Sequence, residues 1–243
     1  MGYARAGAGA LWDAAAHAAR TAMRRKLVFR DRADAGRRLV KLLAAMALQD
    51  PVVVALPRGG VPVGAEIAKA LGAPLDVAFV RKIGAPDQPE LAVGAIADGT
   101  DPEIVLNHKV VLELGLGEDY LAAEATRQLE TIEHRRREYQ ALRPEVDCAG
   151  RDVIVVDDGV ATGMTMQAAL RHIRRRRSPR RLIAAAPVAS REALAMLRNE
   201  ADAVACLGSP SGFGSVGSFY CVFTQVSDEE VAALLKEAAA RGA

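Results

Sequence analysis

The sequence is poor in cysteine, in net charge and in long apolar runs. Its three cysteines, Cys148, Cys206 and Cys221, are odd in number and show no C-x-x-C spacing, which is typical of structural thiols in a reducing compartment and not of a disulfide framework. The net charge of +2 gives no general argument for a nucleic-acid or membrane partner. No apolar run approaches the roughly 18–20 residues of a membrane span. We therefore expect a cytoplasmic protein without a membrane partner.

The length and composition indicate one main domain. A chain of 243 residues, 51% apolar and 26% charged, can bury one substantial core with a small appended subdomain. Residues 1–26 are rich in Ala and Arg and lack the compact apolar stretch of a secretory signal. We interpret them as a frayed or helical N-terminal extension rather than an organellar transit peptide. Residues 27–243 are predicted to form a single domain, with a helical insertion at 107–143 and a C-terminal hood or tail at 208–243.

The most informative stretch covers residues 153–166. Four consecutive β-branched residues open it and predict a strand buried on both faces. Asp157 and Asp158 follow at the C-terminal end of this strand, and a loop of small and hydroxyl residues leads into a helix expected over 164–177. Ligands of open α/β sheets bind at this edge. Loop and helix amides can hold a phosphate, and two carboxylates can accept from a vicinal diol, so the stretch predicts a site for a ribose 5-phosphate.

A second strand–loop–helix unit lies upstream. A strand at 52–56 runs into Pro57-Arg58-Gly59-Gly60, and a helix over 61–71 follows. Two glycines allow a close approach of the backbone to an anion, and Arg58 can donate charge-assisted hydrogen bonds to it.

The remaining elements are predicted from periodicity and turn residues. Residues 81–90 contain two prolines and a glycine and are predicted to be a long exposed loop. We expect a small hairpin from 91–97 and 103–106, and a β-type run at 219–223. Further strands are expected at 75–80, 182–188 and 203–207, and helices at 33–48, 117–142, 191–198 and 228–240, the last capped by Ser227.

Several familiar motifs are missing or fail in context. The chain has no G-x-x-x-x-G-K-[ST] loop. A G-x-G-x-x-G sequence at 212–217 leads into the aromatic run at 219–223 and not into a helix, so a dinucleotide site is excluded. Gly208–Gly212 places Pro210 where an esterase needs its nucleophile. The arginine-rich block at 171–181 has no interleaved aromatic residue to stack bases, which disfavours nucleic-acid binding.

Residues 153–166 resemble the phosphoribosyl-pyrophosphate (PRPP) motif of type I phosphoribosyltransferases, in which a hydrophobic strand, two acids and a loop with Thr-Gly follow one another. Segments 58–61 and 80–86, the central motif and the tail at 213–231 recur in this order in one uncharacterised branch of predicted phosphoribosyltransferases. The resemblance covers about residues 27–235. It implies an α/β fold with a mainly parallel, twisted sheet flanked by helices, and a small hood built from the C-terminal segment and the 107–143 insertion.

The resemblance also implies roles for individual residues. The ribose hydroxyls would bind Asp157 and Asp158. A mobile loop would bring Arg81 or Lys82 to the pyrophosphate and Glu90 to the base for proton transfer. A cis peptide bond is expected between Pro57 and Arg58. The pyrophosphate would contact Arg58, Gly59 and Gly60, and the 5-phosphate would contact Gly159, Val160, Ala161, Thr162, Gly163 and Thr165.

The expected function is a Mg²⁺-dependent phosphoribosyltransferase of nucleotide salvage, which moves 5-phosphoribosyl from PRPP to a nitrogenous base or runs the reverse pyrophosphorolysis. Mg²⁺ would be held through PRPP and water, with no direct protein ligand. We also expect a homodimer. The 6-oxopurine enzymes carry an Asp where this chain has Ala161, so hypoxanthine and guanine are disfavoured. Two alternatives stay open: a PRPP-sensing regulator that binds nucleic acid, and a phosphosugar hydrolase that reuses the PRPP site.

Overall fold

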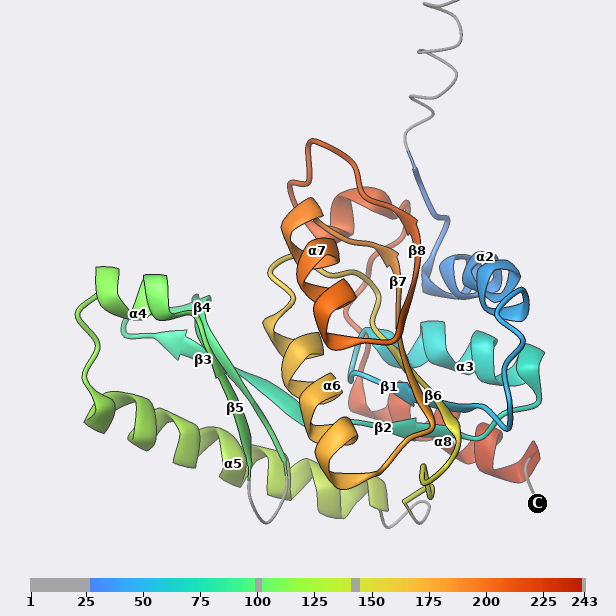
Figure 1. Cartoon of the computed structure of the whole chain (residues 1–243), viewed down its shortest axis with the longest axis horizontal. Coiled ribbons are helices and arrows are strands. Elements are labelled where there is room, and N and C mark those ends of the chain that lie inside the picture. The colour runs from blue at the N-terminus through green and yellow to red at the C-terminus, as the bar shows by residue number, and fades with distance from the viewer. Residues whose placement is uncertain (1–26, 99–101, 141–144, 242–243) are drawn as a thin grey trace, which may run out of the picture.

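The computed structural model describes residues 27–98, 102–140 and 145–241, so the predicted extension at 1–26 lies outside the described part (Figure 1). The main body is a five-stranded parallel sheet in the order β2-β1-β6-β7-β8. Its strands are β1 (Val52–Ala55), β2 (Leu75–Val77), β6 (Asp152–Val156), β7 (Arg181–Val188) and β8 (Ala203–Gly208).

Helices cover both faces of this sheet because successive strand residues alternate between two apolar layers. In β6, Ile154 and Val156 pack on one side, with helices α2, α3 and α8, while Val153 and Val155 pack on the other, with α6 and α7. The helices are α2 (Arg32–Ala44), α3 (Gly60–Leu71), α6 (Met164–Arg176), α7 (Arg191–Glu200) and α8 (Asp228–Arg241). The predicted α/β fold with a sheet buried on both faces is confirmed.

A second, antiparallel sheet forms an arm beside the body (Figure 1). It contains β3 (Val80–Ala85), β4 (Gln88–Ala97) and β5 (Glu103–Leu106), followed by α4 (His108–Glu113) and α5 (Glu118–Gln140). The expected pairing of 91–97 with 103–106 is confirmed. The chain leaves the main sheet after Val77, earlier than the predicted strand end.

The prediction of a long exposed loop at 81–90 is wrong, because this segment is a β-hairpin with a tight turn at Pro86 and Asp87. Asp87 takes up a positive φ of 58° in that turn. Ile83 is fully buried against the apolar stripe of α5, which includes Ile132. The burial of Ile83 and its strand neighbours against α5 overrides the local preference of proline and glycine for irregular structure.

The C-terminal tail also differs from its prediction. Residues 219–223 are not a strand; a 3₁₀ helix, η1 (Val216–Phe219), leads to a single bridge between Tyr220 and Phe29. The aromatic rings pack on one another, with the Tyr220 and Phe223 centroids 5.0 Å apart, so they form a small cluster and not a ladder.

Helix α8 begins as predicted: the Glu230 N–H donates to Ser227 Oγ at 3.2 Å. Among the described residues, no helix has the length and apolarity needed to cross a membrane.

Candidate active site

The two predicted ligand loops meet at one edge of the main sheet. Strands β1 and β6 are direct neighbours, and the N–H of Leu56, the residue after β1, donates to the O atom of Val156, the last residue of β6, at 2.9 Å. A Cβ atom on Gly59 would lie 2.1 Å from Asp158 Oδ2, and one on Gly60 would lie 2.6 Å from Val156 O. Only glycine permits this approach. The peptide bond between Pro57 and Arg58 is cis, as the family resemblance implied.

Asp157 and Asp158 form a crowded carboxylate pair at this edge. Asp157 Oδ1 accepts the Asp158 N–H at 2.8 Å. Burial, together with the charge of Asp158, raises the pKa of Asp157 well above its ordinary value. Burial also raises the pKa of Asp158, although the neighbouring Arg32 opposes that shift. Two adjacent carboxylates that are largely buried are costly to ionise. Hydroxyl donors or cations placed beside them would stabilise their ionised form.

Arg32 is the principal site residue that the sequence did not reveal. Its Nε donates to Asp158 Oδ2 at 2.7 Å, and its Nη1 donates to the carbonyl of Thr224 at 2.7 Å. The guanidinium lies 3.9 Å from the ring centroid of Phe223, within the range of a cation–π contact. The side chains of Arg32 and Asp158 are only 11% and 13% exposed. Arg32 therefore ties the first turn of α2 and the C-terminal tail to the carboxylate pair.

The tail closes over the pair from the other side. The Tyr220 hydroxyl donates to the carbonyl of Asp158 at 2.5 Å, and burial raises the pKa of Tyr220, so it stays a neutral donor. Phe29 packs against Tyr220 at 5.3 Å between ring centroids. Residues Phe29–Arg32 and the tail thus lie beside the carboxylate pair, while α5 of the 107–143 insertion packs on the arm. That the C-terminal segment and the insertion build a hood over a base stays a prediction.

The loop after Asp158 is held by hydrogen bonds at its start, while its amides at the start of α6 have no side-chain cap. Val160 N–H donates to Val188 O at 2.9 Å, and Ser190 Oγ donates to Ala161 O at 2.6 Å. The Val160 N–H is thus already hydrogen-bonded within the protein and does not serve the predicted role of phosphate donor. The neighbouring amides of the loop are the remaining candidates. Ala161 and Thr162 are exposed. Gly163 has a φ of 84° and gives α6 no side-chain cap, so the amides of the first helical turn are suited to an anion.

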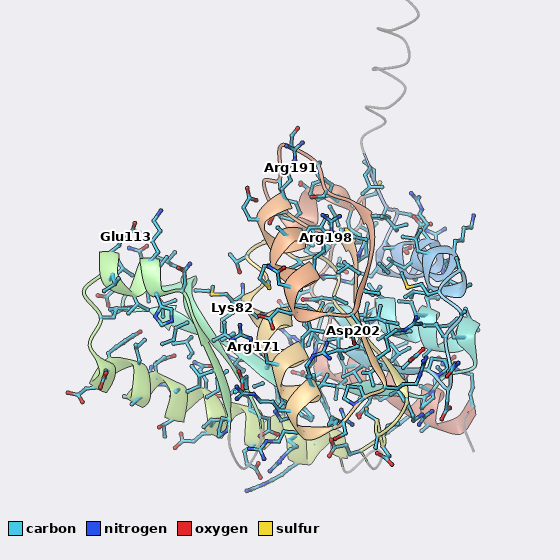
Figure 2. All side chains as sticks on the ribbon, in the orientation of Figure 1. Lys82, Glu113, Arg171, Arg191, Arg198 and Asp202 are labelled. Carbon is cyan, nitrogen blue, oxygen red and sulfur yellow. The ribbon has the colours of Figure 1, made fainter. Side chains whose placement is uncertain are left out.

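The arm presents its two basic residues in opposite directions, as neighbours on a strand must. Arg81 Nε donates to Gln128 Oε1 on α5 at 2.7 Å. Burial, followed by the nearby Arg135 and Arg58, lowers the pKa of Arg81. The charge of Lys82 reaches Asp157 and lowers its pKa; Figure 2 shows Lys82 between the arm and the body. Glu90 lies on β4, and its side chain is outside the described part.

Arg58 is oriented by α8. Its Nη1 lies 3.5 Å from Asp228 Oδ2, and the other carboxylate oxygen of Asp228 accepts the Tyr139 hydroxyl at 2.6 Å. The sequence analysis did not identify Asp228 or Tyr139 as site residues. In the sequence, Asp228 looks like an ordinary acidic residue in the first turn of a helix. A groove of about 350 Å³ runs along Arg58, Gly59, Asp158 and Arg32 to residues 223–226.

The arginine-rich block at 171–181 is largely an internal ion-pair network. Arg177 reaches Asp76 at 2.6 Å with both side chains about nine-tenths buried. The other pairs are Arg171 with Glu200, Arg174 with Asp202, Arg175 with Glu103, and Arg180 and Arg181 with Asp152. These charges are paired with carboxylates of neighbouring elements, which weakens the only sequence argument for nucleic-acid binding.

The chain was compared with known proteins. The phosphoribosyl transferase domain family matches residues 31–218. A protein of Mycobacterium tuberculosis named "Putative phosphoribosyl transferase" is 43% identical over 211 residues, which are 87% of this chain and 47% of that protein. The chain thus spans about half the length of the curated relatives it matches. The crystal structure of the protein TT1426 from Thermus thermophilus is 45% identical, has a TM-score of 0.72 and aligns over 86% of this chain and 98% of that one.

Proposed function

Because the chain belongs to the phosphoribosyl transferase family, we propose that it transfers 5-phosphoribosyl from PRPP to a nitrogenous base and releases pyrophosphate. The observation that carries this proposal is the meeting of three features at one sheet edge. These are the paired carboxylates of Asp157 and Asp158, the close-packed glycines after Arg58, and the start of α6 without a side-chain cap. Together they offer acceptors for a diol and two separate sites for phosphate groups.

The proposed binding roles are those that the family resemblance implies, and this geometry supports them. The ribose hydroxyls donate to Asp157 and Asp158. The 5-phosphate is held by amides between Gly159 and Thr165, with the hydroxyls of Thr162 and Thr165 as further donors. The pyrophosphate is held by Arg58 and the amides of Gly59 and Gly60, with Lys82 above it from the arm. Charge-assisted hydrogen bonds of this kind are the stronger ones in proteins.

The chemistry is a displacement at C1 of the ribose. The bond from C1 to the pyrophosphate oxygen breaks, the bond from C1 to the base nitrogen forms, and the base loses a proton. The site stabilises the negative charge that grows on the leaving pyrophosphate, through Arg58 and Lys82. Closure of the β3–β4 hairpin over the groove excludes water and brings Glu90 to the base to accept its proton. No protein nucleophile is needed.

The side chains of the proposed site are compatible with Mg²⁺ that binds together with PRPP. The described residues include no cluster of three or more His, Cys, Asp or Glu side chains that would form a protein cage for a metal ion. Mg²⁺ keeps several waters and binds readily to substrate phosphates, so it would be held through PRPP and water, with no direct protein ligand. When bound, the ion would neutralise charge on the pyrophosphate.

The acceptor base lies in the groove beside Arg32 and residues 223–226. Ala161, where the 6-oxopurine enzymes carry an Asp, disfavours hypoxanthine and guanine. Because the curated relatives are about twice as long as this chain, the substrates of those larger proteins do not identify the base.

The test is pyrophosphate release from PRPP with Mg²⁺ and a panel of adenine, uracil, orotate, hypoxanthine and guanine. We expect release with one base outside the 6-oxopurines, and PRPP to raise the melting temperature. The Asp157→Asn/Asp158→Asn double variant keeps the fold and loses the PRPP-induced rise, because amides replace the charged acceptors. An unchanged rise in that variant contradicts the ribose contacts, and release without any base would indicate a hydrolase instead.

A further inference from the structure

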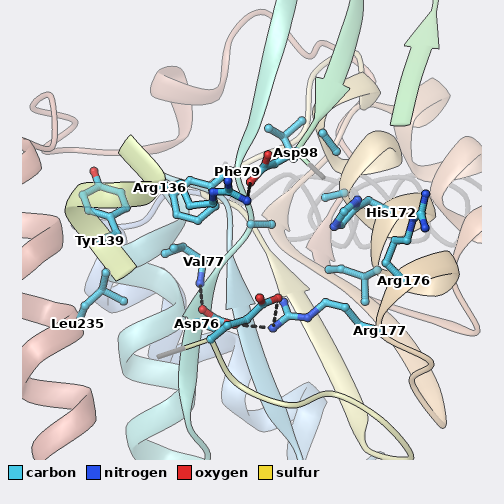
Figure 3. Close-up of a pocket in the computed structure, with 16 residues that line it drawn as sticks. Asp76, Val77, Phe79, Asp98, Arg136, Tyr139, His172, Arg176, Arg177 and Leu235 are labelled. Carbon is cyan, nitrogen blue, oxygen red and sulfur yellow. Dashed lines mark hydrogen bonds and ion pairs between the residues drawn. The ribbon is translucent and has the colours of Figure 1, made fainter. Parts of the chain in front are cut away.

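A second cavity lies away from the carboxylate pair, at the edge strand β2. It has a volume of about 270 Å³ and is walled by the segment from Asp76 to Val80, by the C-terminal half of α6, and by side chains from α5 and α8 (Figure 3). It shares no lining residue with the groove beside Asp158. None of the residues assigned above to ribose, phosphate or pyrophosphate lines it, so the proposed reaction leaves this cavity without a role.

One wall of the cavity is aromatic and apolar. Phe79 is partly buried and stacks on Tyr139, with ring centroids 6.0 Å apart and planes inclined by 29°. Leu235 of α8 and Val77 of β2 extend this wall. A flat ring would pack here in an offset or inclined arrangement, which is the favoured geometry for aromatic pairs.

Hydrogen-bond donors also line the cavity. Arg136 from α5 lies beside Phe79, and His172 with Arg176 from α6 lies across from them, as Figure 3 shows. A guanidinium carries five N–H donors, more than the ion pair of Arg136 with Asp98 at 3.3 Å and its contact with Glu133 use.

Each carboxylate of the cavity has a cationic partner. Asp76 accepts from the backbone N–H of Val77 and Val146 and from Arg177. Glu145 lies 3.1 Å from the same Arg177, and Asp98 lies 3.3 Å from Arg136. A ligand that fills the cavity would therefore have to supply acceptors for the donors that these pairs leave over.

His172 supplies an independent sign of a missing partner. Its Nδ1 is buried and has no hydrogen-bond partner among the described residues. Burial lowers the pKa of His172, so the ring is neutral near pH 7. A buried polar atom without a partner is costly, and the residue that carries this one lines the cavity.

We propose that this cavity binds a small aromatic anion. The flat ring of the ligand packs against Phe79 and Tyr139, and its carboxylate or phosphate accepts hydrogen bonds from Arg136 and from the ring of His172. A volume near the lower end of known ligand pockets fits a compound with one ring and one anionic group.

The cavity walls continue into the transferase site, and this step rests on the proposed function. Tyr139 holds Asp228, which in turn contacts Arg58 of the pyrophosphate loop. Val80 lines the cavity and directly precedes Arg81 and Lys82 on β3. Tyr139 and Val80 thus connect this cavity to Arg58 and Lys82, the residues proposed to face pyrophosphate.

The test is calorimetric titration of the Asp157→Asn/Asp158→Asn chain. This variant loses the proposed ribose contacts of the transferase site, so binding that remains can be assigned to the cavity at β2. The probes are benzoate and uridine 5′-monophosphate, with uridine and orthophosphate as half-ligands that lack the anion or the ring. We expect one of the two full probes to bind at one site per chain, and each half-ligand to bind more weakly. Arg136→Gln lowers the affinity about tenfold, the loss expected for one charge-assisted hydrogen bond.

Arg137→Gln is the matched control, because Arg137 is the next residue on α5 and also pairs with Glu133, but its side chain is 77% exposed and does not line the cavity. Its affinity should stay within about twofold of the parent chain. His172→Leu is the second variant and should also weaken binding; histidine-ring NMR of the parent chain should show His172 shifting with the probe.

Absence of binding by both full probes overturns the proposal, as does an equal loss in Arg136→Gln and Arg137→Gln or a His172 signal that does not move. Failure of the transferase proposal would appear separately, as a lack of pyrophosphate release by the unmodified chain.

Discussion

At the scale of single residues, the proposed sugar site depends on how two adjacent carboxylates are kept in their ionised form. Arg32 meets Asp158 at 2.7 Å and stacks on Phe223, and Lys82 acts on Asp157 through its charge. Both cations oppose the rise in pKa that burial imposes. The two carboxylates proposed to hold the sugar therefore need counter-charges from α2 and from the arm, which are distant in sequence.

The first prediction concerns Arg32. Arg32→Gln should raise the dissociation constant of PRPP about tenfold, because a hydrogen bond to a charged group contributes about 1.5–3 kcal/mol and its loss leaves Asp158 harder to ionise. Thermal-shift titration with PRPP measures the change. Arg30→Gln is the control, since Arg30 is 69% exposed and pairs with Asp31. Tighter binding in Arg32→Gln would mean that Arg32 competes with the ribose instead of positioning Asp158.

At the scale of elements, the contact between the loop after β1 and the end of β6 sets the geometry. Strand pairing brings the two loops to one edge, and Gly60 then passes so close to Val156 that no side chain fits between them. The arm adds a second constraint, because burial of Ile83 against α5 turns residues 81–90 into a hairpin that carries Lys82 toward Asp157.

The second prediction tests this close approach. Gly60→Ala should lower the free energy of unfolding by about 1–3 kcal/mol, since its Cβ would meet the Val156 carbonyl at 2.6 Å and the backbone must shift. Urea denaturation measures the loss. Gly117→Ala, which has open space around the new atom, should change stability by less than about 0.5 kcal/mol. Equal stabilities of the two variants would show that the loop and β6 do not touch.

At the scale of the whole molecule, ion pairs from the arginine-rich block join α6 to both sheets and to α7. Arg177 reaches β2 through Asp76, Arg175 reaches β5 through Glu103, and Arg171 reaches the end of α7 through Glu200. These ion pairs connect the arm to the body of the molecule.

The third prediction follows from the difference in burial within this block. Arg177→Met should cost about 3–5 kcal/mol of unfolding free energy, because it leaves Asp76 buried without its cation. Arg174→Met should cost less than about 1 kcal/mol, since both partners of its pair with Asp202 are more than 40% exposed. Chemical denaturation of both variants distinguishes the two. Similar losses would place the two pairs in equivalent environments and contradict the buried position of Asp76.

The sequence alone was sufficient for features that depend on local order. The β-branched run before Asp157 and Asp158, the glycines after Arg58 and the Ser227 cap each require particular residue types at fixed spacing, and all lie where the pattern predicts. The family resemblance and the α/β fold follow from the same local units, because a strand, a ligand loop and a helix are continuous in the chain.

Only the tertiary structure decided which distant residues complete the site. The pairing of Arg32 with Asp158, the link from Tyr139 through Asp228 to Arg58, and the hairpin at 81–90 depend on packing between segments that are far apart in sequence. The cavity at β2 depends on it as well, since its walls come from six separate elements. Side-chain charges and apolar faces can meet in many ways along an unfolded chain, and burial in one particular core selects among them.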